Sequence, residues 1–203
     1  ALIALLEEAV KEFNSLLPSE YIERKKVGIV GEIFLKFHPF ANQNIISWLM
    51  SQKIEVIPPT LTPFITQFFV NRDVKLDNNL DTSSIPNPIM RLIYGIVKKE
   101  ISRFNSIMSK FRYYSPIEDI YELAEDVKNV IPLVAQFGEG WALSAEIISL
   151  AKNKADGVIS LQPFGCIANH IISKGVENKI KQLYPDLSLL SLDFDSGVSE
   201  VNV

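Results

Sequence analysis

The sequence predicts an α/β fold, an open parallel sheet of about four strands with helices on both faces and a helical insertion between strands two and three. Four short apolar runs bounded by turn residues indicate strands, at Lys26–Gly31, Glu55–Ile57, Val158–Leu161 and Ser188–Leu192. Patterns of helical period separate these runs, and strands that alternate with helices form parallel sheets. The second and third runs lie far apart in the sequence, so we place the helical insertion at about residues 71–155.

The first half of the chain predicts a helix, a strand, a second helix and a second strand. The opening helix follows from apolar residues at helical spacing, and Pro18 ends it. The apolar residues are Leu2, Leu5, Leu6, Ala9, Val10 and Phe13. After the first strand we expect a loop through Pro39 and then a helix over about Asn42–Gln52, with Asn42 as its cap. The second strand ends at Pro58, which cannot donate to a sheet.

Helices are also predicted around and within the insertion. Thr62 followed by proline begins a short helix over Phe64–Val70, and the polar stretch Asn71–Pro86 breaks the pattern. A long amphipathic helix is expected over Asn87–Tyr113, because its apolar residues lie on one broad face. A capping-box pattern then predicts a helix over Pro116–Val130.

The last third of the chain predicts two more helices around the third strand. Residues Trp141–Lys152 have a helical pattern, and Trp141 is expected in the core. The third strand leads into Gln162–His170, which contains the only cysteine. A helix over about Asn169–Tyr184, with Asn169 as its cap, leads to the last strand.

The composition is that of a globular protein of 203 residues, for which we expect one domain spanning residues 1–203. Apolar residues make up 47% and charged residues 22%, and a net charge of −4 gives no basic field for nucleic acid. No apolar stretch is long enough to span a bilayer, so no membrane association is expected. A single cysteine excludes an internal disulfide and fits a cytoplasmic location.

Several common enzyme signatures are absent from the sequence. It contains neither the glycine-rich fingerprint of dinucleotide-binding folds nor a phosphate loop. The serine hydrolase elbow, the HExxH zinc motif and the CxxC redox motif are also missing. Two histidines, His38 and His170, leave little material for a zinc site. Nucleotide, hydrolase, metalloprotease and thioredoxin chemistry therefore have no support here.

Cys166 is the strongest candidate for a functional residue. It lies in the segment that connects the third strand to the next helix. In open α/β sheets ligands bind beyond the carboxyl ends of the strands, and a thiolate is stabilised where a helix begins. Thiolates are also the preferred ligands of iron–sulfur clusters, although one cysteine cannot hold a cluster by itself. The alternative is a buried small apolar side chain, the usual environment of a free cysteine.

Three further candidates lie near the predicted strand ends. His170 is four residues beyond Cys166 and either faces the same site or bonds to the backbone. Glu139, between two glycines, either approaches a substrate or cluster or is a solvated acid in a turn. Glu32, at the end of strand one, has the same alternatives. The aromatic-rich segment Phe34–Phe40 is either core and loop packing or an apolar wall around a cofactor.

Five segments together resemble one protein family. In chain order they are Val27–Ile33, His38–Asn42, Gly138–Trp141, Gln162–His170 and Asp193–Asn202. From about residue 24 to its end, the chain resembles the 2-hydroxyacyl-CoA dehydratase family, specifically the dehydratase-like portion of the large fusion proteins called CoA-substrate-specific enzyme activases. The segment around Cys166 is the most specific part of this resemblance.

The resemblance implies a low-potential radical system that acts on an acyl-CoA. In that system an ATP-hydrolysing activase component passes an electron to a dehydratase component, which holds a [4Fe-4S] cluster on cysteines. Cys166 would be the one metal ligand from this chain, and Glu32, Glu139 and His170 are further candidates for cofactor binding. The other cysteines and the activase motifs are missing. We therefore expect a domain excised from a larger multidomain protein, inactive in isolation and without its cluster.

Two functions remain open at this point. In the first, the chain is a dehydratase-like domain that contributes Cys166 to a cluster for radical acyl-CoA dehydration or related low-potential electron transfer, and the chemistry belongs to the cofactor. In the second, it is a non-catalytic interaction or scaffold domain of the fusion protein. It would then contact the activase part through the helical insertion, and Cys166 would be a buried structural thiol.

Overall fold

The computed structural model describes residues 2–17, 22–82 and 85–195, and it confirms the predicted α/β class. The strands are β1 (Lys26–Gly31), β2 (Glu55–Ile57), β3 (Gly157–Pro163) and β4 (Ser188–Phe194). They form one parallel sheet in the order β2-β1-β3-β4. The pairing of β1 with β3 runs from Val27 opposite Gly157 to Gly31 opposite Leu161. Because the strands are parallel, their carboxyl ends lie along one edge of the sheet.

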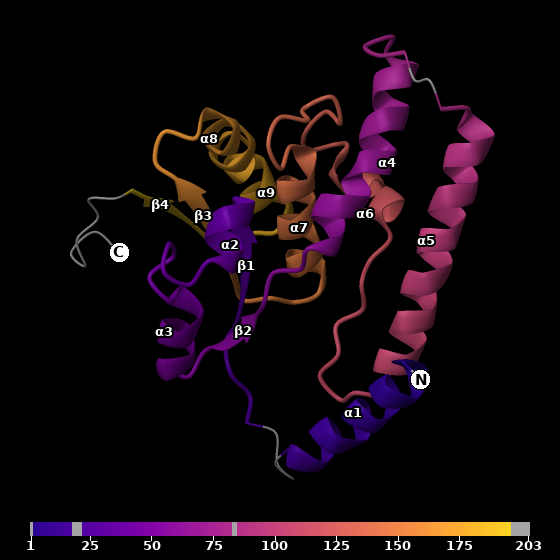
Figure 1. Ribbon diagram of the computed structural model, residues 1–203. Helices are drawn as coiled ribbons and strands as arrows, with labels where there is room; N and C mark the ends of the chain where they lie inside the picture. The colour runs from indigo at the N-terminus through magenta and orange to yellow at the C-terminus, as the bar shows by residue number, and fades with distance from the viewer. Residues whose placement is uncertain (1, 18–21, 83–84, 196–203) are drawn as a thin grey trace.

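Helices cover both faces of the sheet, as predicted (Figure 1). The helices of the described residues are α1 (Leu2–Leu16), α2 (Ile33–Phe37), α3 (Ile45–Ser51), α4 (Thr62–Asp77), α5 (Asn87–Met108), α6 (Ile120–Val127), α7 (Trp141–Lys152), α8 (Ile167–Ser173) and α9 (Glu177–Leu183). Consecutive strand residues point to opposite faces. Ile29 and Ile159 therefore pack with α2 and α3, whereas Val30 and Val158 pack with α7, α8 and α9.

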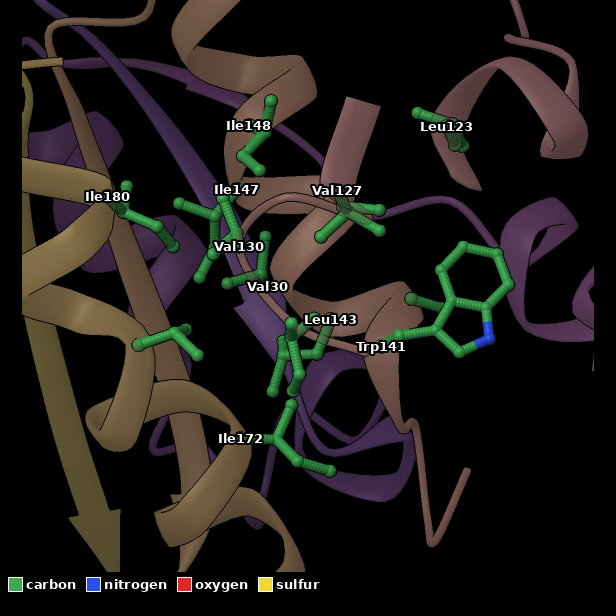
Figure 2. Packing of buried hydrophobic residues seen from close by; sticks show 14 of the residues in the cluster. Val30, Leu123, Val127, Val130, Trp141, Leu143, Ile147, Ile148, Ile172 and Ile180 are labelled. Atoms are coloured by element: carbon green, nitrogen blue, oxygen red, sulfur yellow. The ribbon is translucent and has the colours of Figure 1, made fainter. Parts of the chain in front are cut away.

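The larger core lies between the sheet and α7. Trp141 of α7, Val127 of α6 and Ile180 of α9 are fully buried there. Figure 2 shows these side chains together with Val30 of β1. The indole Nε1 of Trp141 donates a hydrogen bond to Asn71 Oδ1 at 2.7 Å, so the polar atom of the buried ring is paired. The expectation that Trp141 is a core residue is confirmed.

The structure contains more helix than predicted in two places. The segment after β1, predicted as a loop, contains the short helix α2. Helix α4 continues past Val70 to Asp77, although the polar residues there were expected to break the pattern. Its extension packs against α6, because the hydroxyl of Tyr121 donates to Asp73 Oδ2 at 2.7 Å. Tertiary contacts thus stabilise a segment with a weak helical pattern.

Helix α6 begins later than predicted. Asp119 is its N-cap, and the carboxylate accepts a hydrogen bond from Tyr121 N at 2.9 Å. The preceding segment binds to α5, because Asn105 accepts from Ile117 N at 3.0 Å and donates to Ile117 O at 2.8 Å. The prediction that a capping box at Ser115 begins this helix is therefore wrong.

The long helix predicted over Asn169–Tyr184 is divided into two. Helix α8 ends at Ser173, a 3₁₀ turn follows over Lys174–Val176, and α9 begins at Glu177. Gly175 lies in this turn, and glycine disfavours a continuous α-helix because it keeps more backbone freedom in the unfolded chain. The division leaves α8 as a separate short element after Cys166.

The segment between β2 and β3 contains α4, α5, α6 and α7, and from here on the helical insertion means α4, α5 and α6. In Figure 1, α5 lies alongside α4, and α1 crosses near the end of α5. An ion pair joins Lys110 to Glu7 at 3.1 Å, and Asn14 Nδ2 donates to Lys110 O at 2.8 Å. Among the described residues, no helix combines the length and the apolar character needed to cross a membrane.

Candidate functional site

The predicted site residues lie along the carboxyl edge of the sheet. Glu32 follows β1, whereas Cys166 and His170 follow β3. Glu139 reaches the same edge from the loop before α7, where its carboxylate accepts a hydrogen bond from Ile33 N at 2.9 Å. The fold therefore gathers these candidates from three separate parts of the sequence.

Two glycines shape this edge. Gly31, the last residue of β1, has a φ of +125°, and a Cβ there would lie 2.0 Å from the carbonyl oxygen of Leu161. Gly165, directly before Cys166, has a φ of +79°. Residues with a Cβ rarely adopt these conformations, so glycine is required for both strand exits. The two exits set the position of the Cys166 loop.

Cys166 is the N-cap of α8, and it is partly exposed. Its backbone N donates to Pro163 O at 3.1 Å, which closes a turn directly after β3. This partial exposure differs from the alternative in which Cys166 is a buried structural thiol. Asn169 was predicted to cap this helix, but it lies inside α8 and is fully buried.

His170 is held by two neighbours. Its Nδ1 lies 2.7 Å from the carbonyl oxygen of Cys166, and its Nε2 lies 3.3 Å from Asp193 Oδ1. The other oxygen of Asp193 pairs with Lys174 Nζ at 2.9 Å. The imidazole thus connects the Cys166 loop to the end of β4. These two contacts fix the orientation of the His170 side chain.

Glu32 and Glu139 both bind the first turn of α2. Glu32 Oε2 accepts from Leu35 N at 2.9 Å as the N-cap, and Glu139 Oε1 accepts from Ile33 N at 2.9 Å. Backbone N–H groups at a helix start have no intrahelical partner, and carboxylates satisfy them well. Both carboxylates therefore stabilise the start of α2. Their participation in cofactor binding remains a prediction.

A buried ion pair that the sequence did not indicate lies behind α2. The Lys36 side chain is 2% exposed, and its Nζ lies 3.2 and 3.1 Å from the two carboxylate oxygens of Glu146 on α7. Burial raises the pKa of the Glu146 carboxyl, the Lys36 charge opposes this shift, and the nearby Glu139 charge adds to it. A lysine within the otherwise apolar α2 was the available signal, but its partner lies too far away in sequence to be identified.

Two buried carboxamides lie close to Cys166 in the sequence. Gln162 near the end of β3 and Asn169 in α8 are fully buried. Their side-chain nitrogens and oxygens have no hydrogen-bond partner among the described residues. Asn42, by contrast, donates through Nδ2 to Leu35 O at 2.7 Å, and Asn44 rather than Asn42 caps α3. Both asparagine cap predictions are therefore wrong.

Large apolar side chains are exposed in the segments that follow β3 and β1. Phe164 and Ile167, on either side of it in the chain, are 71% and 72% exposed. Phe34 and Phe40, which follow β1, are 58% and 86% exposed. We call these four side chains the apolar rim. Core packing does not account for them, and large exposed apolar side chains favour contact with another surface.

Cys166 has the one side chain at this edge of the type that iron–sulfur clusters prefer as a ligand. Cys166, a partly exposed residue, lies at the strand exit, and unpaired amides lie near it in the chain. A complete cluster site needs several thiolate ligands, whereas the sequence contains one cysteine. Within the described residues, no group of three or more His, Cys, Asp or Glu side chains could hold a metal ion. The remaining ligands would have to come from elsewhere.

Two clefts lie away from this edge, in the helical insertion. One, of about 460 Å³, lies along α4 and is lined by Phe64, Phe68 and Met90. The other, of about 290 Å³, lies beside Tyr94 and Asp119. Neither contains a predicted site residue, so we base the functional argument on the chemistry at the strand edge.

Comparison of the chain with protein families, curated proteins and solved structures finds no match.

Proposed function

We propose that this chain is a dehydratase-like domain of the CoA-substrate-specific enzyme activase type, and that it contributes Cys166 as one ligand of a [4Fe-4S] cluster. The observation that carries this proposal is the position of the thiol. Cys166 is partly exposed at the N-cap of α8, on the carboxyl edge where open α/β sheets bind ligands. The family resemblance of the surrounding segment supplies the identity of the cofactor.

The residues around Cys166 have distinct roles in this proposal. The Cys166 thiolate would hold one iron atom, and His170 would keep the Cys166 carbonyl in place through its contact with Asp193. The apolar rim would pack against the domain that supplies the other ligands and exclude water from the cluster. When bound, a [4Fe-4S] cluster supplies low-potential electron transfer. The partners implied are an ATP-hydrolysing activase component and an acyl-CoA.

The first test is anaerobic reconstitution, with iron and sulfide, of the full-length protein that contains this chain. We expect Cys166→Ala to lower the iron content and the cluster absorbance, because one thiolate ligand is lost. Ser173→Ala, in the same helix, is a matched control that should retain the iron of the wild type. The proposal fails if Cys166→Ala keeps both the iron and the absorbance.

A second test measures access to the thiol. Cys166 is partly exposed, so an alkylating reagent should modify it in the folded chain. Bound iron should protect it from the reagent in the reconstituted full-length protein. Modification that begins only after denaturation would instead favour a packing role for the thiol.

The alternative proposal, a non-catalytic interaction domain, has support from α5. Ile89, Leu92 and Ile96 lie at helical spacing and are 50%, 66% and 57% exposed. An exposed apolar stripe of this kind favours a protein interface. If this function holds, Ile96→Glu weakens binding of the activase component in sedimentation experiments, whereas Cys166→Ala leaves both binding and iron content unchanged.

A further inference from the structure

The larger cleft of the insertion combines apolar surface with a few polar groups. Its volume of about 460 Å³ lies within the range of small-molecule sites. Helix α4 lines it with Phe64 and Phe68, which lie one helical turn apart and are both exposed. Ile85 and the buried Met90 of α5 add apolar surface from the segment that follows α4. The cleft therefore suits a ligand with an apolar body.

Hydrogen bonds fix the elements that line this cleft. Arg72, whose side chain is 8% exposed, donates to Ile85 O at 2.8 Å and to Asn87 Oδ1 at 2.7 Å. These contacts join α4 to the start of α5. Asn71, which also lines the cleft, accepts from the indole Nε1 of Trp141 at 2.7 Å, so α4 is joined to the core as well. A cleft fixed in this way needs little ordering when a ligand binds.

Gln67 brings an unpaired polar group to the cleft. It lines the cleft from α4 and is 7% exposed, and its Oε1 has no hydrogen-bond partner among the described residues. The same oxygen is covered from bulk solvent, although buried carboxamide oxygens are normally paired. The last torsion of a glutamine side chain is broad, so a turn of the carboxamide presents Oε1 to a donor in the cleft. A ligand with an N–H donor would satisfy this oxygen.

Side chains of both signs of charge line the cleft. The charge of Arg72 is countered by Asp73, whose Oδ1 lies 2.9 Å from Nη1. Lys75 of α4 supplies a further cation, and Asp81 supplies an anion. Asp81 accepts from Thr82 N at 2.7 Å through Oδ1. A ligand that complements Lys75, Asp81 and the carboxamide oxygen carries a carboxylate together with an ammonium group.

We propose that this cleft binds a free apolar α-amino acid. The ammonium group would lie toward Gln67 and Asp81, the carboxylate toward Lys75, and the side chain against Phe64 and Phe68. An α-amino acid has both charged groups on one carbon, whereas in a peptide they belong to the two ends of the chain. This inference is independent of the proposed function, because the cleft contains none of the residues on which that function rests.

The test is isothermal titration calorimetry on the full-length protein that contains this chain. The probes are L-phenylalanine and L-leucine, together with phenethylamine, which lacks the carboxylate, and 3-phenylpropanoate, which lacks the ammonium group. We expect L-phenylalanine to bind more tightly than either analogue, because each analogue leaves one charged side chain of the cleft without its partner. Gln67→Leu keeps the approximate volume of the side chain, and it should weaken L-phenylalanine binding about tenfold.

Two charge variants assign the orientation of the ligand. Lys75→Met should weaken L-phenylalanine and 3-phenylpropanoate about two- to fivefold without weakening phenethylamine. Asp81→Asn should weaken L-phenylalanine and phenethylamine by a similar factor without weakening 3-phenylpropanoate. Asp77→Asn, at an exposed residue of α4 that does not line the cleft, is the matched control and should leave all affinities unchanged.

The crossed pattern of the two charge variants supports the proposal, because a loss of fold would weaken all ligands alike. The proposal is overturned if neither amino acid binds or if an analogue binds as tightly as L-phenylalanine. Wild-type affinity in Gln67→Leu also overturns it. Should Gln67→Leu fail to fold, the two charge variants, at exposed side chains, decide the proposal.

Discussion

The half-buried Asp119 cluster of the helical insertion and the buried carboxamides of Gln162 and Asn169 near Cys166 differ in hydrogen bonding. In the insertion, Asp119 accepts from the Tyr94 hydroxyl at 2.7 Å, from Lys98 Nζ at 2.7 Å and from Tyr121 N at 2.9 Å. At the edge, the carboxamide of Asn169 has no partner among the described residues.

The Asp119 cluster binds three helices together. The Tyr94 and Tyr121 rings lie 4.8 Å apart between centroids, and the Tyr121 hydroxyl reaches Asp73 of α4 at 2.7 Å. Burial would raise the pKa of the Asp119 carboxyl, but hydrogen bonds from Lys98, Tyr94 and Tyr121 outweigh it and hold the pKa below its usual value. Burial and the hydrogen bond to Asp119 raise the pKa of Tyr94.

The difference indicates which cluster is structural. A fully paired buried network stabilises the fold, whereas an unpaired buried amide lowers stability by about 1–3 kcal/mol and needs a reason to be retained. We therefore interpret the Asp119 cluster as a brace of the insertion, whereas the unpaired carboxamides of Gln162 and Asn169 lower the stability of the fold. The predictions below test this distinction.

The largest expected loss of stability is at the buried ion pair between Lys36 and Glu146. Lys36→Met should lower the free energy of unfolding by about 3–5 kcal/mol, because it leaves the Glu146 charge buried and unpaired. The loss should be smaller in mildly acidic solution, where Glu146 takes up a proton. Urea denaturation at two pH values measures both. Lys174→Met, at an exposed ion pair, is the control and should lose at most about 1 kcal/mol.

The second-largest expected loss of stability is at Asp119, which braces the insertion. Asp119→Ala removes the N-cap of α6 and the acceptor of the Tyr94 hydroxyl, so we expect a loss of about 2–4 kcal/mol in urea denaturation. Asp126→Ala removes an acid that pairs with Lys152 on the surface and serves as the control. Equal losses in the two variants would contradict the role of Asp119 as a brace.

The pH dependence of stability provides a third test. The pKa of Asp119 is lower in the folded protein than in the unfolded chain, so its contribution is present above the unfolded value of about 4. It is lost as the pH falls through the folded value. Asp119→Asn should therefore lose less stability than the wild type between neutral and acidic pH. Identical pH profiles in thermal unfolding would show that the Asp119 network does not stabilise the ionised carboxyl.

The smallest effects should have opposite signs at the Ser160–Ser173 hydrogen bond and at the unpaired amide of Asn169. Ser173→Ala breaks the hydrogen bond to Ser160, so it should lower stability by about 1 kcal/mol. Asn169→Leu removes an unpaired amide and should leave the unfolding temperature of the iron-free chain unchanged or raise it. Calorimetry of the two variants measures the comparison directly. A large loss in Asn169→Leu would mean that the amide is paired in the resting protein.

Much of the fold was predictable because its signals are local. The apolar runs of β1 and β2 and the helical pattern of α7 give the observed bounds, and the parallel arrangement follows from their alternation. Cys166 was also identifiable, because a lone thiol at a strand exit is visible in the sequence. The helix α2 was not, since its first turn depends on Glu139, a residue more than a hundred positions away.

The sequence by itself determined the α/β class, the strand positions and the candidate thiol, because side-chain periodicity and turn residues act over a few neighbours. Only the tertiary structure decided the pairing of Lys36 with Glu146 and the extension of α4. It also decided that Asp119, and not Ser115, caps α6. Each of these depends on contacts that form only when the chain folds. Where a polar group is buried, the presence or absence of its partner dominates its contribution to the free energy of unfolding. The burial of Gln162 and Asn169 without hydrogen-bond partners among the described residues was likewise visible only in the tertiary structure.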